Sequence, residues 1–340
     1  MPRIEKTKRV IIADFSRGLY QTSNPTLLPA GFATDLNNVN FHEAPALATR
    51  RGRAAFDEVD PADKAGGLFV HRTQAGSYFL IRSLGSTGSL DNWNGESWES
   101  LGTMTPMMPV YGVAFPSKDW LIVGDGILMK YFDGTTLSTL ENAPALLCLE
   151  VHLNKLWGVH ELTKIEYCAT GNPEDWSTAD DYGYIMVDNA AGEPVTALKS
   201  HRGCLFVWTQ SSMYALFGDS PSNFSLVHMP EGKGCYSHFS VVEIDGLLYW
   251  FSPDGIVQYQ YGAKPRVVSR NRIDAIIGDV DIHRTDEICG GTDGIQYRLS
   301  LPGITKDHEI IFDPRWNNGA GAFTKNDDQT YCRYVLWRKP

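Results

Sequence analysis

Short apolar runs alternate with turn-forming residues along most of this chain. The runs are rich in Val, Ile, Phe, Tyr and Trp, which is typical of strands rather than helices. Asx-Gly pairs recur between them, at Asn94-Gly95, Asp125-Gly126, Asp133-Gly134, Asp245-Gly246, Asp254-Gly255, Asp293-Gly294 and Asn318-Gly319. Such a pair supplies the two positive φ angles of a two-residue type I′ turn, the tight connection of a β-hairpin. The pattern therefore predicts a series of hairpins and an all-β fold.

From about residue 65 the hairpins group into units of roughly 35–45 residues, the length of a propeller blade. The units span residues 67–98, 111–140, 147–176, 195–228, 240–269 and 287–323, followed by a terminal strand from Tyr331 to Trp337. Only three strands are placed in the third unit, which ends in a turn at 172–176. One blade cannot bury both faces of its sheet, whereas a closed ring of blades can. We therefore predict a β-propeller of about six blades.

The first part of the chain differs, so we divide it into an N-terminal arm, residues 1–60, and a β-propeller, residues 61–340. The arm holds short strand-like pieces, Val10–Ala13 and Val39–Phe41, separated by proline and glycine. A segment of this kind must pack on something to be ordered. Closure of a propeller usually needs a strand from one terminus, and either Val10–Ala13 or Tyr331–Trp337 fits that role.

The formal net charge of −10 argues against a protein that grips nucleic acid over a broad basic face. An acidic wall repels a passing polyanion and prevents it from sticking. Basic residues gather near the start of the chain, at Lys6, Lys8, Arg9, Arg17, Arg50, Arg51 and Arg53. They form either a solvated arm or a tail that docks on an acidic partner.

The six cysteines lie far apart and none shows CxxC spacing, so we expect free, buried thiols. No apolar run reaches the roughly 18–20 residues of a membrane-spanning helix. The first residues also lack the apolar segment of a secretory signal. We expect neither membrane insertion nor export by that route.

Catalytic motifs are weak in this sequence. The elbow GxSxG, the phosphate loop GxxxxGK[ST] and the helical HExxH motif are all absent. Asp279, Asp281 and His283 alternate along an extended segment, which offers either three metal ligands on one face or a solvated face. His152 and His160 flank a hairpin, where they lie near each other or are separately satisfied.

Two loop features remain. The acidic pairs Glu174-Asp175 and Asp180-Asp181 follow a turn and form either a calcium site or a polar loop. The segment 89–98 is close to the SxDxGxxW turn of sialidases, but two extra residues separate Asp91 from Gly95.

Tryptophans lie beside predicted turns, where they either stack on sugars or pack between sheets. They are Trp93, Trp98, Trp176 and Trp316. We favour packing, and we predict no catalytic residue, no metal and no cofactor.

The arm is similar to the opening of a known family. Residues 14–20 (DFSRGLY) lead through Asn24-Pro25 and Leu28-Pro29 to residues 33–39 (ATDLNNV), Phe41 and residues 47–52 (LATRRG). Later segments agree in order: 170–176 (TGNPEDW), 211–218 (SSMYALFG), 234–256, 296–302 and 311–316. This ordered set resembles bacteriophage tail nozzle proteins, also called tail tubular or phage stabilisation proteins.

The resemblance implies a β-propeller built into a virion's tail and made in the bacterial host cytoplasm. It implies a hexameric ring around the DNA exit channel, docking to an adaptor or portal ring, and contact with tail fibre or tip proteins. DNA would pass through the channel without sequence-specific binding. This chain is short for the family, with little room for inserted platform domains.

We therefore expect a structural virion protein, a tail nozzle or head–tail connector component, and not an enzyme. The residues expected to order the arm in subunit contacts are Phe15, Leu19, Leu36, Asn38, Arg51 and Gly52. One alternative is a carbohydrate-binding or glycan-cleaving propeller that acts as a receptor-binding tail component. It predicts either two carboxylates at hydrolase separation or several loop aromatics exposed together. A second alternative is a monomeric cellular protein-interaction propeller.

Overall fold

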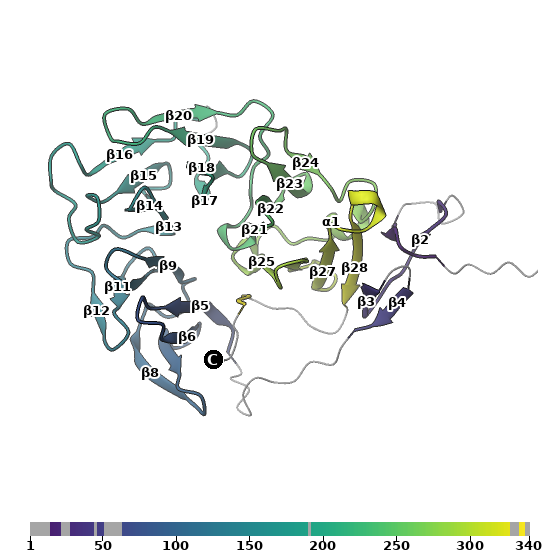
Figure 1. The fold of residues 1–340 in the computed structure, drawn as a ribbon, viewed down its shortest axis with the longest axis horizontal. Helices are drawn as coiled ribbons and strands as arrows, with labels where there is room; N and C mark the ends of the chain where they lie inside the picture. Colours follow the sequence, from purple (N-terminus) through teal and green to yellow (C-terminus); the bar gives the residue numbers. More distant parts are fainter. Residues whose placement is uncertain are drawn as a thin grey trace, which may run out of the picture.

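Six four-stranded antiparallel sheets stand around a common axis in a computed structural model of the chain (Figure 1). The structure describes residues 14–21, 28–43, 46–50, 63–189, 192–326 and 333–336. The fold is an all-β six-bladed propeller, as the spacing of the hairpins predicted, with N-terminal strands outside the ring.

In each blade the first strand lies nearest the axis and the last lies at the rim (Figure 1). The strands of the first three blades are β5 (Ala65–Arg72), β6 (Tyr78–Leu84), β7 (Ser89–Trp93) and β8 (Trp98–Thr103) in blade 1; β9 (Tyr111–Phe115), β10 (Trp120–Gly124), β11 (Met129–Phe132) and β12 (Leu137–Thr139) in blade 2; and β13 (Leu147–His152), β14 (Lys155–His160), β15 (Lys164–Tyr167) and β16 (Gly183–Met186) in blade 3.

The other three blades repeat this order. Their strands are β17 (Val195–His201), β18 (Cys204–Thr209), β19 (Met213–Phe217) and β20 (Ser225–His228) in blade 4; β21 (Val242–Ile244), β22 (Leu247–Ser252), β23 (Gly255–Gln260) and β24 (Arg266–Val267) in blade 5; and β25 (Cys289–Thr292), β26 (Tyr297–Leu301), β27 (His308–Asp313) and β28 (Ala322–Asn326) in blade 6.

The helices of the described residues are short, and all but η4, which lies between two strands of blade 6, connect blades. They are η2 (His238–Ser240), α1 (Asp274–Ile277), η3 (Thr285–Glu287) and η4 (Asn317–Gly319). Within the described ranges, no helix has both the length and the apolar character needed to span a membrane. The five cysteines in these ranges are buried and free, as expected, and Cys332 lies outside them.

Type I′ hairpins join the first and second strands of blades 3, 4 and 5. Both turn residues have positive φ in Leu153-Asn154, Arg202-Gly203 and Asp245-Gly246. Only the last of these is an Asx-Gly pair. At Asp125, Asp133 and Asp293 the turn is longer, and the aspartate side chain accepts hydrogen bonds from N–H groups two and three residues on. The prediction of two-residue turns was wrong there, although each pair still marks a hairpin.

Hydrophobic clusters fill five of the six seams between neighbouring blades. Trp157 is fully buried in the seam between blades 3 and 4. Trp208 and Trp250 lie 5.4 Å apart between ring centroids in the next seam. These large aromatic side chains stabilise the ring because each removes much apolar area from water.

The sixth seam, between blades 6 and 1, has a different character. On blade 6, Tyr297, Phe312 and Phe323 share one face, which packs toward blade 5. Ser300 and Glu309 lie in register on the opposite face, which is mostly polar. No hydrophobic cluster of the described residues therefore joins blade 6 to blade 1.

Each blade takes its four strands from one continuous stretch of chain, and in the part of the chain that the structure describes no terminal strand completes a blade. Residues 333–336 form no strand, which makes the prediction of a closing strand at 331–337 wrong within the described residues. The alternative closing strand, Val10–Ala13, lies outside them.

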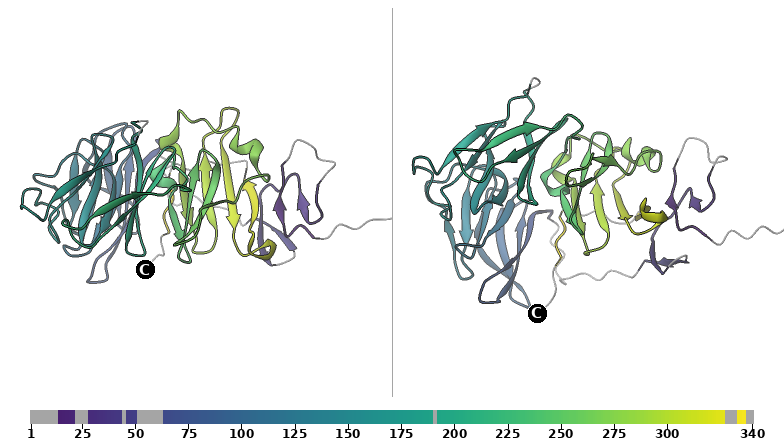
Figure 2. Two further views of the ribbon diagram at one scale, coloured as in Figure 1. Left: turned by 90° about the horizontal axis from the view of Figure 1, so that it is seen from above. Right: turned by 45° about the horizontal axis from the view of Figure 1, so that its top comes forward.

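The arm forms two small two-stranded sheets beside blade 6, at one end of the molecule's long axis (Figure 2). The parallel pair is β1 (Gly18–Leu19) with β2 (Phe32–Ala33), and the antiparallel pair is β3 (Val39–Glu43) with β4 (Ala46–Thr49). The boundary between residues 60 and 61 lies outside the described residues.

Candidate functional site

Three of the six arm residues named from the sequence, Leu19, Leu36 and Asn38, contact the outer edge of blade 6. Leu19 and Leu36 are buried in the same hydrophobic cluster as Phe312 and Phe323. Phe15 is half-buried and its carbonyl accepts a hydrogen bond from the Gly18 N–H at 3.0 Å. Arg51 and Gly52 lie outside the described residues.

Main-chain bonds hold the arm to β28 as an added strand segment. The Asn38 N–H donates to the Lys325 carbonyl at 2.9 Å, and the Lys325 N–H donates to the Leu36 carbonyl at 3.1 Å. Asn38 has a φ of 56°, a conformation that asparagine tolerates better than most residues. This contact lies within one chain, and the role of these residues toward another subunit stays a prediction.

Glycine at position 18 permits the closest approach of the arm. A side chain there would place its Cβ 2.7 Å from the Phe323 nitrogen, and the φ of Gly18 is 86°. Lys325 also forms an ion pair with Asp35 at 3.0 Å. The described part of the arm is therefore fixed by backbone fit and apolar burial, and the Asp35–Lys325 ion pair adds a charged contact.

The axis of the propeller is filled by aromatic and basic side chains. The Tyr111 ring of β9 stacks on Phe239 of η2, with 4.7 Å between centroids. The Arg333 guanidinium, from the C-terminal segment, lies 3.6 Å from the Phe239 ring centroid. A cavity of about 420 Å³ remains, lined by the inner strands and by Tyr334, Val335 and Leu336.

Charged groups around the axis are paired. Lys199 of β17 donates to Glu150 of β13 at 3.0 Å. His201 Nδ1 lies 3.2 Å from Glu243 of β21, with no hydrogen bond between them. The Lys199–Glu150 bond thus joins blades 3 and 4 at their inner strands.

Burial sets the protonation state of two further axial groups. It raises the pKa of Tyr111 well above its usual value. Burial, with the nearby charges of Lys199 and Arg333, lowers the pKa of His238 to about 3. Both side chains are neutral at physiological pH, and neither is poised to exchange a proton there.

Arg333 bridges the polar seam between blades 6 and 1. Its guanidinium donates to the Gly66 carbonyl at 2.9 Å and to the Asp286 carbonyl at 3.0 Å. Lys64 pairs with Glu287 across the same seam at 2.9 Å. A second cavity, of about 310 Å³, lies beside these contacts. The C-terminal residues therefore close the ring as a clasp of polar contacts.

The sialidase-like segment is a packed hairpin. Asp91 accepts hydrogen bonds from Ser89 Oγ and Arg82 Nε, and it is buried. Trp93 and Trp98 contact each other edge to face at 5.4 Å, and Arg82 lies over Trp98. The Asp91 carboxylate is therefore engaged by hydrogen bonds within the blade.

The three possible metal ligands near residue 280 do not converge. Asp279 binds Thr305 and His308, and these bonds lower the pKa of Asp279 to about 2. Asp281 accepts a hydrogen bond from the His283 N–H in a turn. Across the described residues, no group of three His, Cys, Asp or Glu side chains could hold a metal ion.

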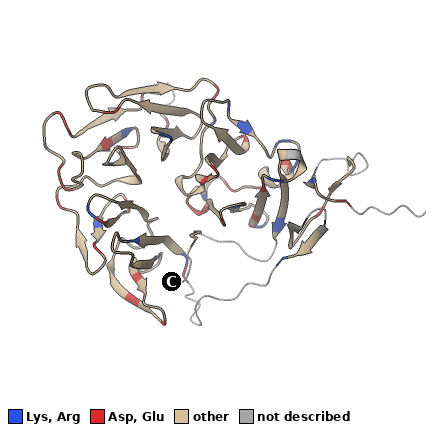
Figure 3. Ribbon diagram, viewed as in Figure 1, with Lys and Arg blue, Asp and Glu red and all other residues tan. Residues whose placement is uncertain are grey.

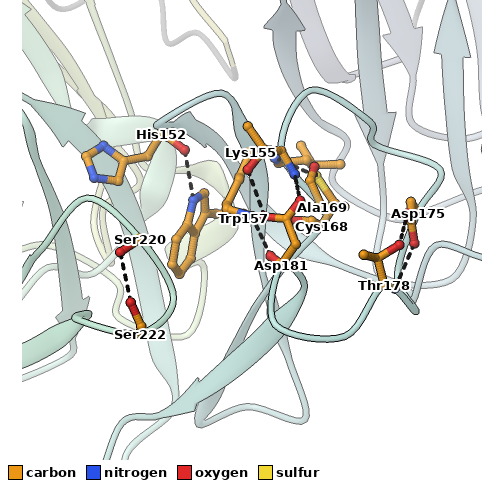
Figure 4. A network of polar contacts seen from close by, with 12 residues as sticks. His152, Lys155, Trp157, Cys168, Ala169, Asp175, Thr178, Asp181, Ser220 and Ser222 are labelled. Atoms are coloured by element: carbon orange, nitrogen blue, oxygen red, sulfur yellow. Dashed lines mark hydrogen bonds and ion pairs between the residues drawn. The ribbon is translucent and has the colours of Figure 1, made fainter.

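In the acidic loop of blade 3, Asp175 and Asp181 bind donors of the protein itself (Figure 4). Asp181 pairs with the buried Lys155, whose ammonium also donates to the Cys168 carbonyl. Asp175 accepts hydrogen bonds from the Ser177 and Thr178 N–H groups in a turn. These donors satisfy Asp175 and Asp181, so these two carboxylates are engaged within the protein.

The two histidines of the same blade are not brought together. His152 Nδ1 lies 2.9 Å from Ser200 Oγ of blade 4. His160 Nδ1 lies 2.8 Å from Glu166 Oε1. Each histidine contacts a different partner through Nδ1, so the two do not form a shared site.

The four turn tryptophans are half-buried and packed. Trp176 donates to the Pro173 carbonyl at 2.7 Å, and Trp316 contacts Phe41 at 6.1 Å between centroids. The glycan alternative predicted that such residues stand exposed together, and these four do not.

Sequence reasoning missed η2 and the C-terminal clasp. Phe239 gave no signal because a single aromatic residue in a connection fits many roles. Arg333 lies in a segment whose apolar pattern favoured a strand. Both are defined by contacts between blades far apart in sequence, which local patterns do not record.

Comparison with known proteins supports the fold alone. No family model matches the chain, and no curated protein matches it. Among solved structures, virginiamycin B lyase from Staphylococcus aureus is similar at 10% identity over 78% of this chain and 86% of that chain, with a TM-score of 0.51.

Two other propellers are similar at lower scores. A putative 6-phosphogluconolactonase from Bacteroides uniformis has 13% identity over 79% of this chain and 84% of its own, with a TM-score of 0.45. Hsv2 from Kluyvelomyces marxianus has 11% identity over 78% of this chain and 84% of its own, with a TM-score of 0.42. Since propellers serve many activities, this likeness carries no function.

Proposed function

We propose that this chain is a structural protein of a tailed-bacteriophage virion, a tail nozzle or head–tail connector subunit. Six copies would form a ring around the DNA exit channel and dock on an adaptor or portal ring. The observation that carries the proposal is the arm. The motif residues that resemble the nozzle family, among them Leu19 and Leu36, are those that build the layer on blade 6.

The filled axis determines where DNA would pass. Tyr111, Phe239 and Arg333 occupy the centre of each propeller, so a conduit would have to lie between subunits. Residues of both charge signs are distributed around the ring (Figure 3), with a net charge of −10. A lumen with a net acidic wall would let DNA slide without sequence-specific binding.

Electron images and the mass of purified full-length protein in solution test this proposal. Rings with a central opening, near six chain masses, are the expected result. A monomer that retains or hydrolyses a glycan would instead support the receptor-binding alternative and remove the nozzle assignment.

A further inference from the structure

The rim strand of blade 3 exposes a stripe of large apolar side chains. On β16, Tyr184 is 60% exposed and Met186 is 53% exposed, and Tyr182 just before the strand is 42% exposed. Leu162, in the adjoining hairpin, is 64% exposed. Each of the other outer blade strands in the described residues, β8, β12, β20, β24 and β28, has at most one exposed large apolar side chain. Apolar surface of this kind on a strand marks an interaction site.

The backbone of β16 is able to accept another strand. It is the last strand of its sheet and pairs only with β15 among the described residues. An edge strand with a row of exposed apolar side chains suits β-augmentation, in which an extended segment adds main-chain hydrogen bonds and apolar contacts.

Acidic residues flank the stripe. Asp180 and Asp188 are exposed on either side of Tyr182, Tyr184 and Met186. Asp181 is already paired with Lys155, so the two outer aspartates supply the charge that faces an incoming segment. The fitting partner is a short extended segment with apolar β-forming residues and positive charges.

Residues 1–13 of this chain have that composition. The sequence MPRIEKTKRVIIA carries Arg3, Lys6, Lys8 and Arg9 and ends in the apolar run from Val10 to Ala13. This segment immediately precedes the part of the arm that packs on blade 6. Blade 6 stands across the ring from blade 3 (Figure 1).

We propose that β16 is the docking edge for residues 1–13 of a second copy of this chain. The inference rests on the proposed function, since a virion ring requires contacts between identical subunits. The contact is heterologous, because the arm end of one copy meets blade 3 of the next. Repetition of such a contact closes into a ring or extends as a chain.

Complementation between two variants of the full-length protein tests the proposal. Variant one carries Tyr184→Thr and Met186→Thr, which keep β propensity but remove the stripe. Variant two carries Lys6→Glu, Lys8→Glu and Arg9→Glu. Phe217→Thr with Val227→Thr, at exposed positions of blade 4, is the matched control. Sedimentation velocity over a range of concentrations is the measurement, with circular dichroism to verify folding.

Wild type and control should associate, while each variant alone should associate at least about tenfold more weakly. An equimolar mixture should form a one-to-one dimer and nothing larger, because it holds one intact segment and one intact stripe. A charge exchange gives a second measurement. Asp180→Lys and Asp188→Lys, added to variant two in the same chain, should restore its self-association.

Three results would overturn the inference: variants that associate like wild type, a mixture that stays monomeric, or a wild type that is monomeric throughout. Rings unaffected by both variants overturn this inference and leave the proposed function standing. A monomeric wild type removes both.

Discussion

The ring of Tyr111 lies nearly parallel to the ring of Phe239, at an interplanar angle of 12°. Tyr111 belongs to blade 2, whereas Phe239 precedes the first strand of blade 5. The stack therefore joins parts of the propeller that share no seam. It acts as a central contact for the ring.

Phe239→Ala should destabilise the protein by roughly 2–4 kcal/mol, since it removes a large side chain and an aromatic pair from the axis. Urea unfolding measures this change. Phe217→Ala is the control, because Phe217 is exposed at the end of β19 and its loss should cost about 0.5 kcal/mol or less. Equal losses for the two variants would contradict the role given to the stack.

Arg333→Ala should loosen the seam between blades 6 and 1. Two charge-assisted hydrogen bonds are lost, so a destabilisation of about 2–3 kcal/mol is expected. Hydrogen exchange should rise in β5 and β25 more than in β13 and β17. Arg270→Ala, at an exposed position, is the control for loss of charge alone. Uniform exchange across all blades would argue against a clasp.

The histidine between blades 3 and 4 should make stability depend on pH. Burial lowers the pKa of His152 to about 4, against about 6.5 in an unfolded chain. The unfolded chain therefore takes up a proton first as pH falls. This contribution to stability is fully present above about pH 6.5 and is lost as pH falls toward 4.

Replacing His152 with Gln should remove up to about 3 kcal/mol of the fall in stability between pH 7.5 and pH 4.5. Urea midpoints at the two pH values give the comparison. His238, whose pKa burial lowers to about 3, remains in the variant and keeps some pH dependence. Parallel pH profiles for variant and wild type would rule out His152 as a source.

Substitutions at two neighbouring arm residues compare the contribution of apolar burial to arm docking with that of a surface ion pair. Leu36 is buried against blade 6, and Leu36→Ala should cost about 2–4 kcal/mol of arm docking. Asp35 pairs with Lys325 at the rim, and Asp35→Ala should cost about 1 kcal/mol or less. Limited proteolysis of the arm measures docking, and faster cleavage in Asp35→Ala than in Leu36→Ala would reverse the interpretation.

The blades could be predicted because their signals are local. Apolar runs and turn residues placed nearly every blade strand within a few residues of its position, as with β18 at Cys204–Thr209. The exception was β16, which follows a loop containing Pro173, Glu174 and Asp175. That loop reads as the end of a unit, although the chain returns to the sheet after it.

The arrangement of the arm and of the seam could not be predicted. Leu19 and Leu36 were expected to make ordering contacts, but nothing in the sequence pointed to β28 as their nearest partner. Polar and apolar residues alternate along the strands of blade 6, as they do in any half-exposed strand. The sequence therefore gave no sign that Glu309 is completely buried. Both features depend on pairing between distant segments.

The arm lies near the start of the chain, whereas β28, on which it packs, lies near the end, and this order affects how the chain folds during synthesis. Leu36 emerges from the ribosome about 290 residues before Phe323, the residue it packs near. At about 5–20 residues per second, the arm waits roughly 15–60 s without its own docking surface. During that interval its apolar residues are accessible to chaperones and to other nascent chains, so the order of translation sets a time window in which subunits can first meet.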